Sequence, residues 1–168
     1  VGRFDAAMDL VAAAALRLRD HGFGAFAQGD LEFGVPAGRD TDIGDLDNHG
    51  LAPGWQEQYA EARHCEVDPV FLHAKRREGP STWGACRERA IREGASRRAL
   101  QVFDEAEEFD LLDGFIMPTL GTHPLVDGVT FGGLDPDLST DGLLDMQMIG
   151  TYAYEGFRRL AEGFNRVS

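Results

Sequence analysis

The amino-acid sequence predicts an α/β (α+β) domain in which helices cover both faces of a mostly antiparallel sheet. Stretches with helical spacing of apolar residues alternate with short apolar runs, which gives the order helix, strands, helices, strands, helix. Residues 114–120 and 125–132 are nearly unbroken apolar runs on either side of a Gly- and Pro-containing turn, which indicates an antiparallel hairpin. Because both faces of these strands are apolar, each face needs a layer of helices.

The N-terminal part of the chain predicts one helix and two strands. Apolar residues at helical spacing predict a helix over residues 5–20, and Gly22 is a natural stop. Residues 23–28 indicate a strand. Its neighbour is expected at residues 31–35 or 41–46, although frequent Gly and Asp make a loop an equally good interpretation there.

Residues 55–83 combine aromatic, acidic and proline residues as no other stretch does. Trp55 and Tyr59 lie four residues apart, which turns two aromatic side chains toward one face of a helix. Asp68-Pro69 indicates a second helix start, because Asp caps a helix N-terminus and Pro fits the first helical position. We expect this second helix over about residues 70–78.

The remaining elements follow from caps and breaks. Trp83 is expected to close a short strand, and residues 85–91 show a mixed pattern. Ser96 is a cap for a helix with a clear apolar stripe. Ser139 or Asp141 is expected to start a long last helix.

Length and composition exclude several classes of protein. A chain of 168 residues fits one domain, residues 1–168. Lys and Arg total 16 against 29 Asp and Glu, a net charge of −13, so this chain alone is not expected to bind nucleic acid. The longest aliphatic run, residues 10–16, is too short for a membrane span. Cys65 and Cys86 have neither metal-site nor disulfide-scaffold spacing, and we expect a cytoplasmic protein.

Trp55, Tyr59, Asp68, Pro69 and Trp83 resemble, in identity and spacing, the autoinducer-binding domain of LuxR-type quorum-sensing regulators. The resemblance covers roughly residues 55–160 and includes the motifs at residues 103–106, 114–118 and 128–131.

The resemblance implies an α-β-α sandwich around a mostly antiparallel five-stranded sheet, in agreement with the order of elements. It also implies the sensor half of a transcriptional regulator, which acts as a homodimer. Full-length members of the family have a C-terminal helix-turn-helix domain that binds DNA. Residues 161–168 are too few to form one, so we expect either an excised sensor half or a natural one-domain relative.

The resemblance also implies a site for a small-molecule signal such as an acyl-homoserine lactone. Trp55 can donate its Nε1–H to the lactone carbonyl, and the carboxylate of Asp68 can accept from the amide N–H. Tyr59 and Thr130 can each donate to the amide carbonyl, and Trp83 would form the wall at the head group by stacking. Such a site is apolar with a few fixed polar groups, and it requires no cofactor.

The sequence departs from the family at several expected contacts. Leu51 stands where the family usually has a tyrosine that donates to the amide carbonyl. Val70, Phe71 and Ile116 stand where many relatives have smaller or more polar residues near the acyl tail. These departures leave the identity of the signal open.

The same residues also have plain structural explanations. A Trp and a Tyr on one helix face are often core residues, and an Asp before Pro is often only a cap. The acidic run of Glu105, Glu107, Glu108 and Asp110 is most simply a solvated helix face.

Other functions remain as weaker alternatives. Asp137 to Gly142 imitate the start of a calcium loop but lack its final Glu, and His64-Cys65 with Asp68 and His73 lacks zinc-site spacing. We therefore expect no metal and no catalytic residues. The alternatives to an acyl-homoserine-lactone sensor are an orphan sensor of another small amphiphile and, in another class, a small esterase- or lactonase-type hydrolase.

Overall fold

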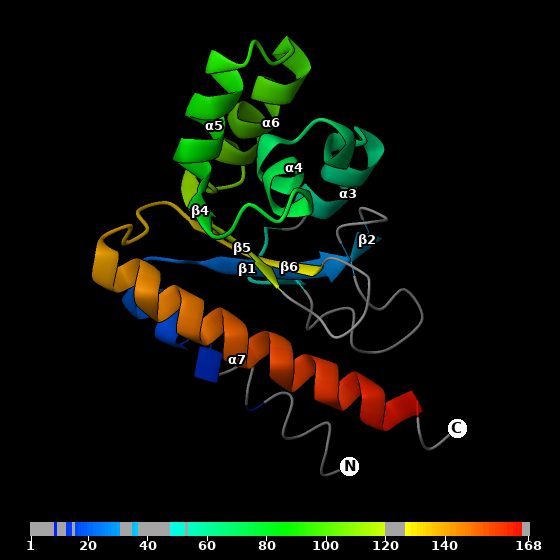
Figure 1. The fold of residues 1–168 in the computed structure, drawn as a ribbon, viewed down its shortest axis with the longest axis vertical. Helices are drawn as coiled ribbons and strands as arrows, with labels where there is room; N and C mark the ends of the chain where they lie inside the picture. The colour runs from blue at the N-terminus through cyan, green and yellow to red at the C-terminus, as the bar shows by residue number, and fades with distance from the viewer. Residues whose placement is uncertain are drawn as a thin grey trace.

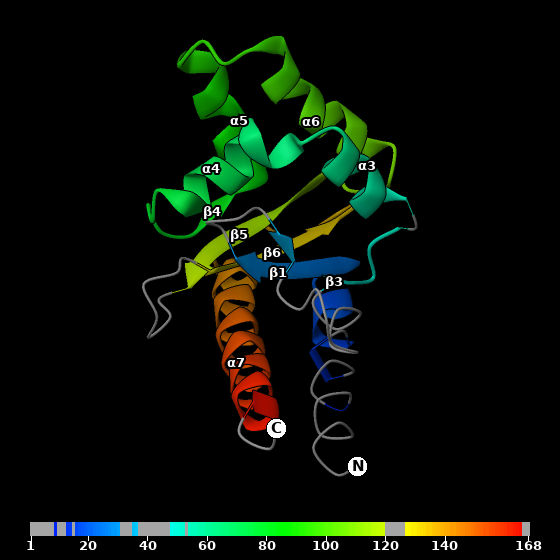
Figure 2. The same cartoon turned by 90° about the vertical axis from the view of Figure 1, so that its right-hand side faces the viewer.

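The computed structural model describes residues 9, 13–14, 16–30, 35–36, 48–52, 54–119 and 127–165. In these parts, helices lie on both sides of a single sheet (Figure 1). Figure 2 shows helices α3 to α6 on one side of the sheet, and α7 with the helical residues 16–20 on the other. Within the described residues, no helix is long and apolar enough to cross a membrane.

Three antiparallel strands form the centre of the sheet. They are, in spatial order, β1 (Ala25–Asp30), β6 (Asp127–Gly133) and β5 (Asp113–Thr119). The strands β5 and β6 confirm the predicted hairpin, and β1 confirms a strand near residues 23–28.

Three two-residue strands extend this centre. β4 (Ser81–Thr82) pairs with β5, whereas β2 (Val35–Pro36) and β3 (Asn48–His49) both pair with β1. The mixed helix and strand class and the antiparallel sheet are therefore confirmed. The expected count of five strands is not, because the described residues form six. The other residues proposed for a second strand, 31–34 and 41–46, lie outside the described residues.

The register of β5 and β6 explains why both strands are apolar on both faces. Phe115 pairs with Phe131 and Met117 with Val129, and these four side chains form a buried cluster against α7 (Thr140–Asn165). One residue along, Ile116 pairs with Thr130 and faces the opposite helix layer, because successive strand residues alternate between faces.

Two helices confirm the predicted starts around residue 55 and residue 69. α3 (Trp55–Glu61) buries Trp55, and α4 (Pro69–Lys75) begins directly after its cap, Asp68. A short 3-10 turn, η1 (His64–Glu66), joins them. α4 ends three residues before the expected Glu78, because the backbone turns at Arg77 and Gly79, both with positive φ.

The expectation for Trp83 was wrong, because Trp83 begins helix α5 (Trp83–Arg92) instead of closing a strand. The hydroxyl oxygen of Thr82 accepts a hydrogen bond from the backbone N–H of Ala85 and caps this helix. The pattern of residues 85–91 looked mixed because α5 buries only two small residues, Cys86 and Ala90.

The last two helices agree with the sequence. Ser96 caps α6 (Arg97–Glu107), and α7 begins at Thr140, between the two predicted starts. Gly150 lets α7 approach the sheet, because an added Cβ would lie 2.5 Å from Sδ of Met117 and 3.0 Å from the ring of Phe131.

Gly22 connects the N-terminal helical segment to β1 and provides a test of the turn. We expect Gly22→Ala to lower the free energy of unfolding, because Gly22 has φ +75° and a Cβ would overlap the backbone carbonyl of Asp135. The left-handed conformation alone costs about 1–2 kcal/mol in Ala. The overlap adds about 1–3 kcal/mol.

The matched control is Gly94→Ala. Gly94 has φ +72°, but none of the described atoms lies within 4 Å of an added Cβ, so only the conformational cost applies. Urea denaturation of both variants measures the difference. Equal destabilisation of the two would contradict the close approach at Gly22.

Candidate functional site

The predicted site residues lie on the face of the sheet that α3 to α6 cover (Figure 2). Apart from Asp68 and Thr130, they belong to two apolar clusters. Val70, Phe71 and Ile116 pack with residues of α4, α5 and α6, whereas Trp55, Tyr59 and Leu51 pack with residues of α6 and β1. Trp83 packs against both clusters, so the fold brings these residues into one continuous region.

The polar centre of this region is the carboxylate of Asp68. Asp68 is buried, and its Oδ1 accepts a hydrogen bond of 2.8 Å from the backbone N–H of Val70. Its Oδ2 accepts a bond of 2.7 Å from the hydroxyl of Tyr59. The cap role of Asp68 is therefore confirmed, and Tyr59 gives it a second function as a buried acceptor.

Burial governs the ionisation of both partners. Burial raises the pKa of Asp68 above its ordinary value, while the bonds from Tyr59 and from backbone N–H groups oppose this rise. Burial, and then the charge of Asp68, raise the pKa of Tyr59 well above its ordinary value. Tyr59 therefore keeps its hydrogen, and any further donor placed against Asp68 would favour the ionised carboxylate.

Trp55 lies beside this pair. Its ring centroid is 5.6 Å from that of Tyr59, in an edge-to-face arrangement, and 5.4 Å from that of Phe109. Trp55 is 9% exposed, so its ring forms part of the core as well as a wall of the candidate site.

Trp83 and Thr130 form a connected pair. The Nε1–H of Trp83 donates to Oγ1 of Thr130 over 2.9 Å, and the hydroxyl of Thr130 donates to the carbonyl of Phe115 over 3.2 Å. The indole lies across the paired Gly114 and Gly132, since a Cβ on either residue would come within 2.5 Å of it. In this structure the hydroxyl of Thr130 therefore orients Trp83.

Two residues that the sequence assigned to other features lie behind the aromatic pair. His64 is 2% exposed, and its Nε2 lies 2.8 Å from Oε2 of Glu105. Glu105 was expected on a solvated face, but its side chain is only 18% exposed, because α6 turns it toward η1 and α3. A helical spacing of acids does not reveal which of them meets a histidine from another element.

Bonds to Glu105 tie α6 to its neighbours. The side chain of Gln58, followed by His64, lowers the pKa of the Glu105 carboxyl against the opposing effect of burial. Gln58 donates to Oε2 over 2.7 Å, and Gln101 donates to Oε1 over 2.8 Å. Glu105 is thus an ionised acceptor that joins α3, η1 and α6.

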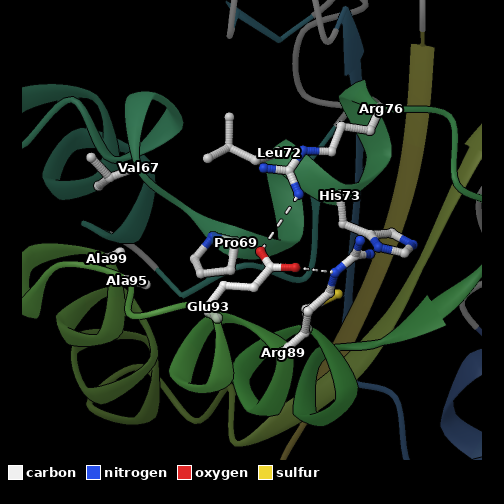
Figure 3. A pocket seen from close by; sticks show the side chains of 11 residues that line it. Val67, Pro69, Leu72, His73, Arg76, Arg89, Glu93, Ala95 and Ala99 are labelled. Carbon is white, nitrogen blue, oxygen red and sulfur yellow. Dashed lines mark hydrogen bonds and ion pairs between the residues drawn. The ribbon is translucent and has the colours of Figure 1, made fainter.

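A small cleft lies elsewhere, between α4 and α5. It has a volume of about 90 Å³ and includes Pro69, Leu72 and Ala90 in its lining, and none of the predicted site residues lines it. Figure 3 shows Glu93 at this cleft in ion pairs with Arg76 and Arg89. The cleft is also lined by Cys86. Burial raises the pKa of the Cys86 thiol to about 11, so this thiol stays protonated at neutral pH.

The possible metal and hydrolase residues show other contacts. His73 bonds to the carbonyl of Gly79, and Asp68 bonds to Tyr59 and to the backbone of Val70, so both side chains have other partners. In the part of the chain that the structure describes, no group of three or more His, Cys, Asp or Glu side chains is placed to hold a metal ion.

Comparisons with known proteins agree with these observations. The family model described as "Autoinducer binding domain" matches residues 7–157. The quorum sensing-dependent regulator RpaR of Rhodopseudomonas palustris is 29% identical over 113 residues, 67% of this chain and 45% of that protein. The activator LuxR of Aliivibrio fischeri is 29% identical over 105 residues, 61% of this chain and 38% of that protein. The chain thus spans less than half the length of these relatives.

Solved structures show the same fold. Escherichia coli SdiA has a TM-score of 0.67 at 15% identity, with 92% of this chain and 62% of that chain covered. A complex of SdiA with octanoyl-rac-glycerol has a TM-score of 0.65 at 14% identity, with 92% and 60% covered.

The Trp83–Thr130 pair gives a prediction for stability. We expect Thr130→Val to lower the free energy of unfolding by about 1–3 kcal/mol, because it leaves the Trp83 N–H without its acceptor and removes a donor to the Phe115 carbonyl. Denaturation followed by tryptophan fluorescence measures this loss.

The same substitution at Thr119 is the control. Thr119 is also a buried strand residue, but its Oγ1 has no hydrogen-bond partner among the described residues. Thr119→Val should therefore leave stability unchanged or raise it. A Thr130→Val variant that is as stable as Thr119→Val would show that the hydroxyl of Thr130 does not hold Trp83.

Proposed function

Because this chain belongs to the autoinducer-binding domain family of LuxR-type quorum-sensing regulators, we propose that it binds an acyl-homoserine-lactone-like signal in a buried pocket. The pocket would lie between the sheet and the helices that contain Trp55 and Asp68. The relatives are named as transcriptional regulators, and we infer that this chain is the sensor part of such a protein, without enzymatic activity.

One observation supports this proposal above the others, namely the buried carboxylate of Asp68. Each carboxylate oxygen can accept more than one hydrogen bond, and Asp68 uses one on Val70 and one on Tyr59. Capacity for a third donor therefore remains, and the amide N–H of an acyl-homoserine lactone is such a donor. When the signal's amide N–H becomes a donor to Asp68, the single hydroxyl hydrogen of Tyr59 could turn from Asp68 to the amide carbonyl. Nε1–H of Trp55 could donate to the lactone carbonyl.

The apolar surroundings fit the rest of such a molecule. Val70 and Ile116 are buried and Phe71 is partly buried, all beside the sheet face that contains Thr130. These side chains would pack against the acyl tail, while Trp83 lies across the sheet as a wall for the head group. The binding needs no metal and no cofactor.

A second candidate is another small amphiphile. Leu51 packs beside Trp55 and Tyr59, and an apolar side chain there supplies no hydrogen-bond donor for an amide carbonyl. SdiA, which shares this fold, has been solved with octanoyl-rac-glycerol. An acylglycerol has hydroxyl donors for Asp68 and an apolar tail, so it is a concrete alternative.

We further propose a cytoplasmic location and DNA binding only through a separate domain. The net charge of −13 would repel a DNA backbone from this domain.

A panel of candidate signals tests the proposed function. Butanoyl, octanoyl and dodecanoyl homoserine lactones, with octanoyl glycerol as the alternative, should raise the melting temperature if they bind the folded state. A ligand at a hundred times its Kd stabilises the fold by about 2.7 kcal/mol. If no lactone shifts the melting temperature but octanoyl glycerol does, the second candidate replaces the first, and no shift with any compound would refute both.

Asp68→Asn separates ligand contact from capping within the same assay. Asn still caps a helix, so the ligand-free variant should stay folded. Loss of the charge-assisted bond should weaken lactone binding by about 1.5–3 kcal/mol, or roughly ten- to hundredfold. Unchanged affinity in titration calorimetry would leave Asp68 as a cap only.

We also propose that the chain forms a homodimer through α7. Leu144, Met148 and Tyr152 follow each other at intervals of four residues on this helix and are 54%, 61% and 72% exposed. Such a stripe can pack against its own copy about a two-fold axis, because each partner presents the same apolar surface.

Charge placed on this stripe tests the dimer. Met148→Lys should shift the protein from dimer to monomer in sedimentation velocity while each chain stays folded, because the side chain is exposed in the single chain. Ile91→Lys is the control, since Ile91 is 56% exposed on α5, away from α7. A monomeric wild type, or a Met148→Lys variant as dimeric as the control, would exclude this surface.

A further inference from the structure

His64 lies directly behind the two aromatic residues of the proposed site. Its ring centroid is 6.1 Å from that of Trp55, with the planes tilted by 32°, and 5.4 Å from that of Tyr59, in an edge-to-face arrangement. Both rings therefore rest against the imidazole. A displacement of His64 would shift the two side chains to which the proposed function assigns the donors for the signal.

Glu105 fixes the position of His64 from another helix. The distance of 2.8 Å between Nε2 and Oε2 is a hydrogen bond, and an ionised carboxylate can only accept. Nε2 of His64 therefore has the hydrogen in this bond. Gln58 and Gln101 hold the same carboxylate, so the acceptor is itself fixed.

The other ring nitrogen of His64, Nδ1, forms no hydrogen bond within the described residues. This nitrogen is buried. In the neutral ring, Nδ1 is a bare acceptor, and a buried acceptor is tolerated more easily than a buried N–H that lacks a partner. The arrangement thus suits the neutral imidazole with its hydrogen on Nε2.

The titratable and charged groups around His64 come from every neighbouring element. Glu105 faces it from α6, Tyr59 from α3 and Asp68 from the start of α4. Cys65 and Glu66 follow it on η1, and Glu66 is paired with Arg63 and Arg98.

We propose that His64 is a positioning residue of the signal site, and that the neutral form of its ring holds Trp55 and Tyr59 in the geometry that binds the signal. This inference rests on the proposed function. Protonation of Nδ1 would create a buried N–H without an acceptor, which forces the ring to move. The charge of Glu105 favours the imidazolium, but Glu105 bonds to Nε2 and supplies no acceptor for Nδ1. The neighbouring aromatic rings supply none either, so the cost of the unpaired N–H remains. Signal binding should therefore weaken as His64 becomes protonated.

The test measures affinity against pH. Octanoyl homoserine lactone is titrated into wild type and His64→Gln at several values between about pH 5 and 8. The amide N–H of Gln can keep the bond to Glu105, but Gln has neither a ring nor an ionisable group. Wild-type affinity should fall by about two- to tenfold toward pH 5, the range of one hydrogen bond. His64→Gln should bind more weakly at pH 8 and show a smaller fall than wild type, because Asp68 is present in both proteins.

Asp68 is the other group at the site that could respond to acid, because burial raises its pKa. A His64→Gln variant with the affinity and the pH profile of wild type would assign the response to Asp68 and overturn the proposal.

One control separates positioning from general structure. His73→Gln removes a histidine that bonds to Gly79 outside the site and should keep the wild-type profile. A lost pH response in this control would contradict a specific role of His64.

Glu105→Gln is the second variant if His64→Gln does not fold. The amide oxygen of Gln can still accept from Nε2–H, but the negative charge that favours the imidazolium is gone. The fall in affinity should then move to lower pH. A fall at the same pH as in wild type would overturn the proposal, because a purely structural residue would not respond to the charge of residue 105.

Tryptophan emission without ligand separates this inference from the proposed function. If none of the signals binds wild type at any pH, the proposed function fails, and His64 is examined through Trp55 alone. Emission should then change between about pH 5 and 8 in wild type and stay constant in His64→Gln. Trp83 is present in both proteins, so a difference in emission between them reports on Trp55. Equal changes in the two proteins would overturn the role of His64.

Discussion

The burial of one carboxylate, that of Asp68, is the constraint on which the candidate site depends. A buried carboxylate must have hydrogen-bond partners, because an unpaired charge in the interior is too costly to keep. The N-terminus of α4 supplies one partner and Tyr59 supplies the other, which fixes α3 and α4 relative to each other. The same requirement makes Asp68 receptive to a donor from a ligand.

The sheet imposes a second constraint, because it is covered on both sides. The face toward α7 is filled by Phe115, Phe131 and their neighbours, whereas the opposite face at Gly114 and Gly132 has no side chains. The indole of Trp83 occupies that space and is oriented by Thr130. The indole packs directly on the backbone of the two glycines, and this contact gives the candidate site a rigid wall.

One acidic residue, Glu105, supports the candidate site from α6. The chain has a large excess of acidic residues, yet Glu105 is turned inward, where it fixes His64 behind Trp55 and Tyr59. The residues closest to the proposed signal are thus supported by a second set of polar contacts from α6. Support of this kind holds aromatic side chains in place more tightly than packing alone.

The sequence by itself determined the local features, because helical spacing, caps and turns are properties of neighbouring residues. It predicted α3, the cap at Asp68, the hairpin of β5 and β6, and the family. Only the tertiary structure decided that Trp83 begins a helix and lies across two glycines, that Thr130 bonds to it, and that a partly buried Glu105 bonds to His64. These contacts join residues up to 47 positions apart, and no local pattern specifies which distant side chain will complete a hydrogen bond.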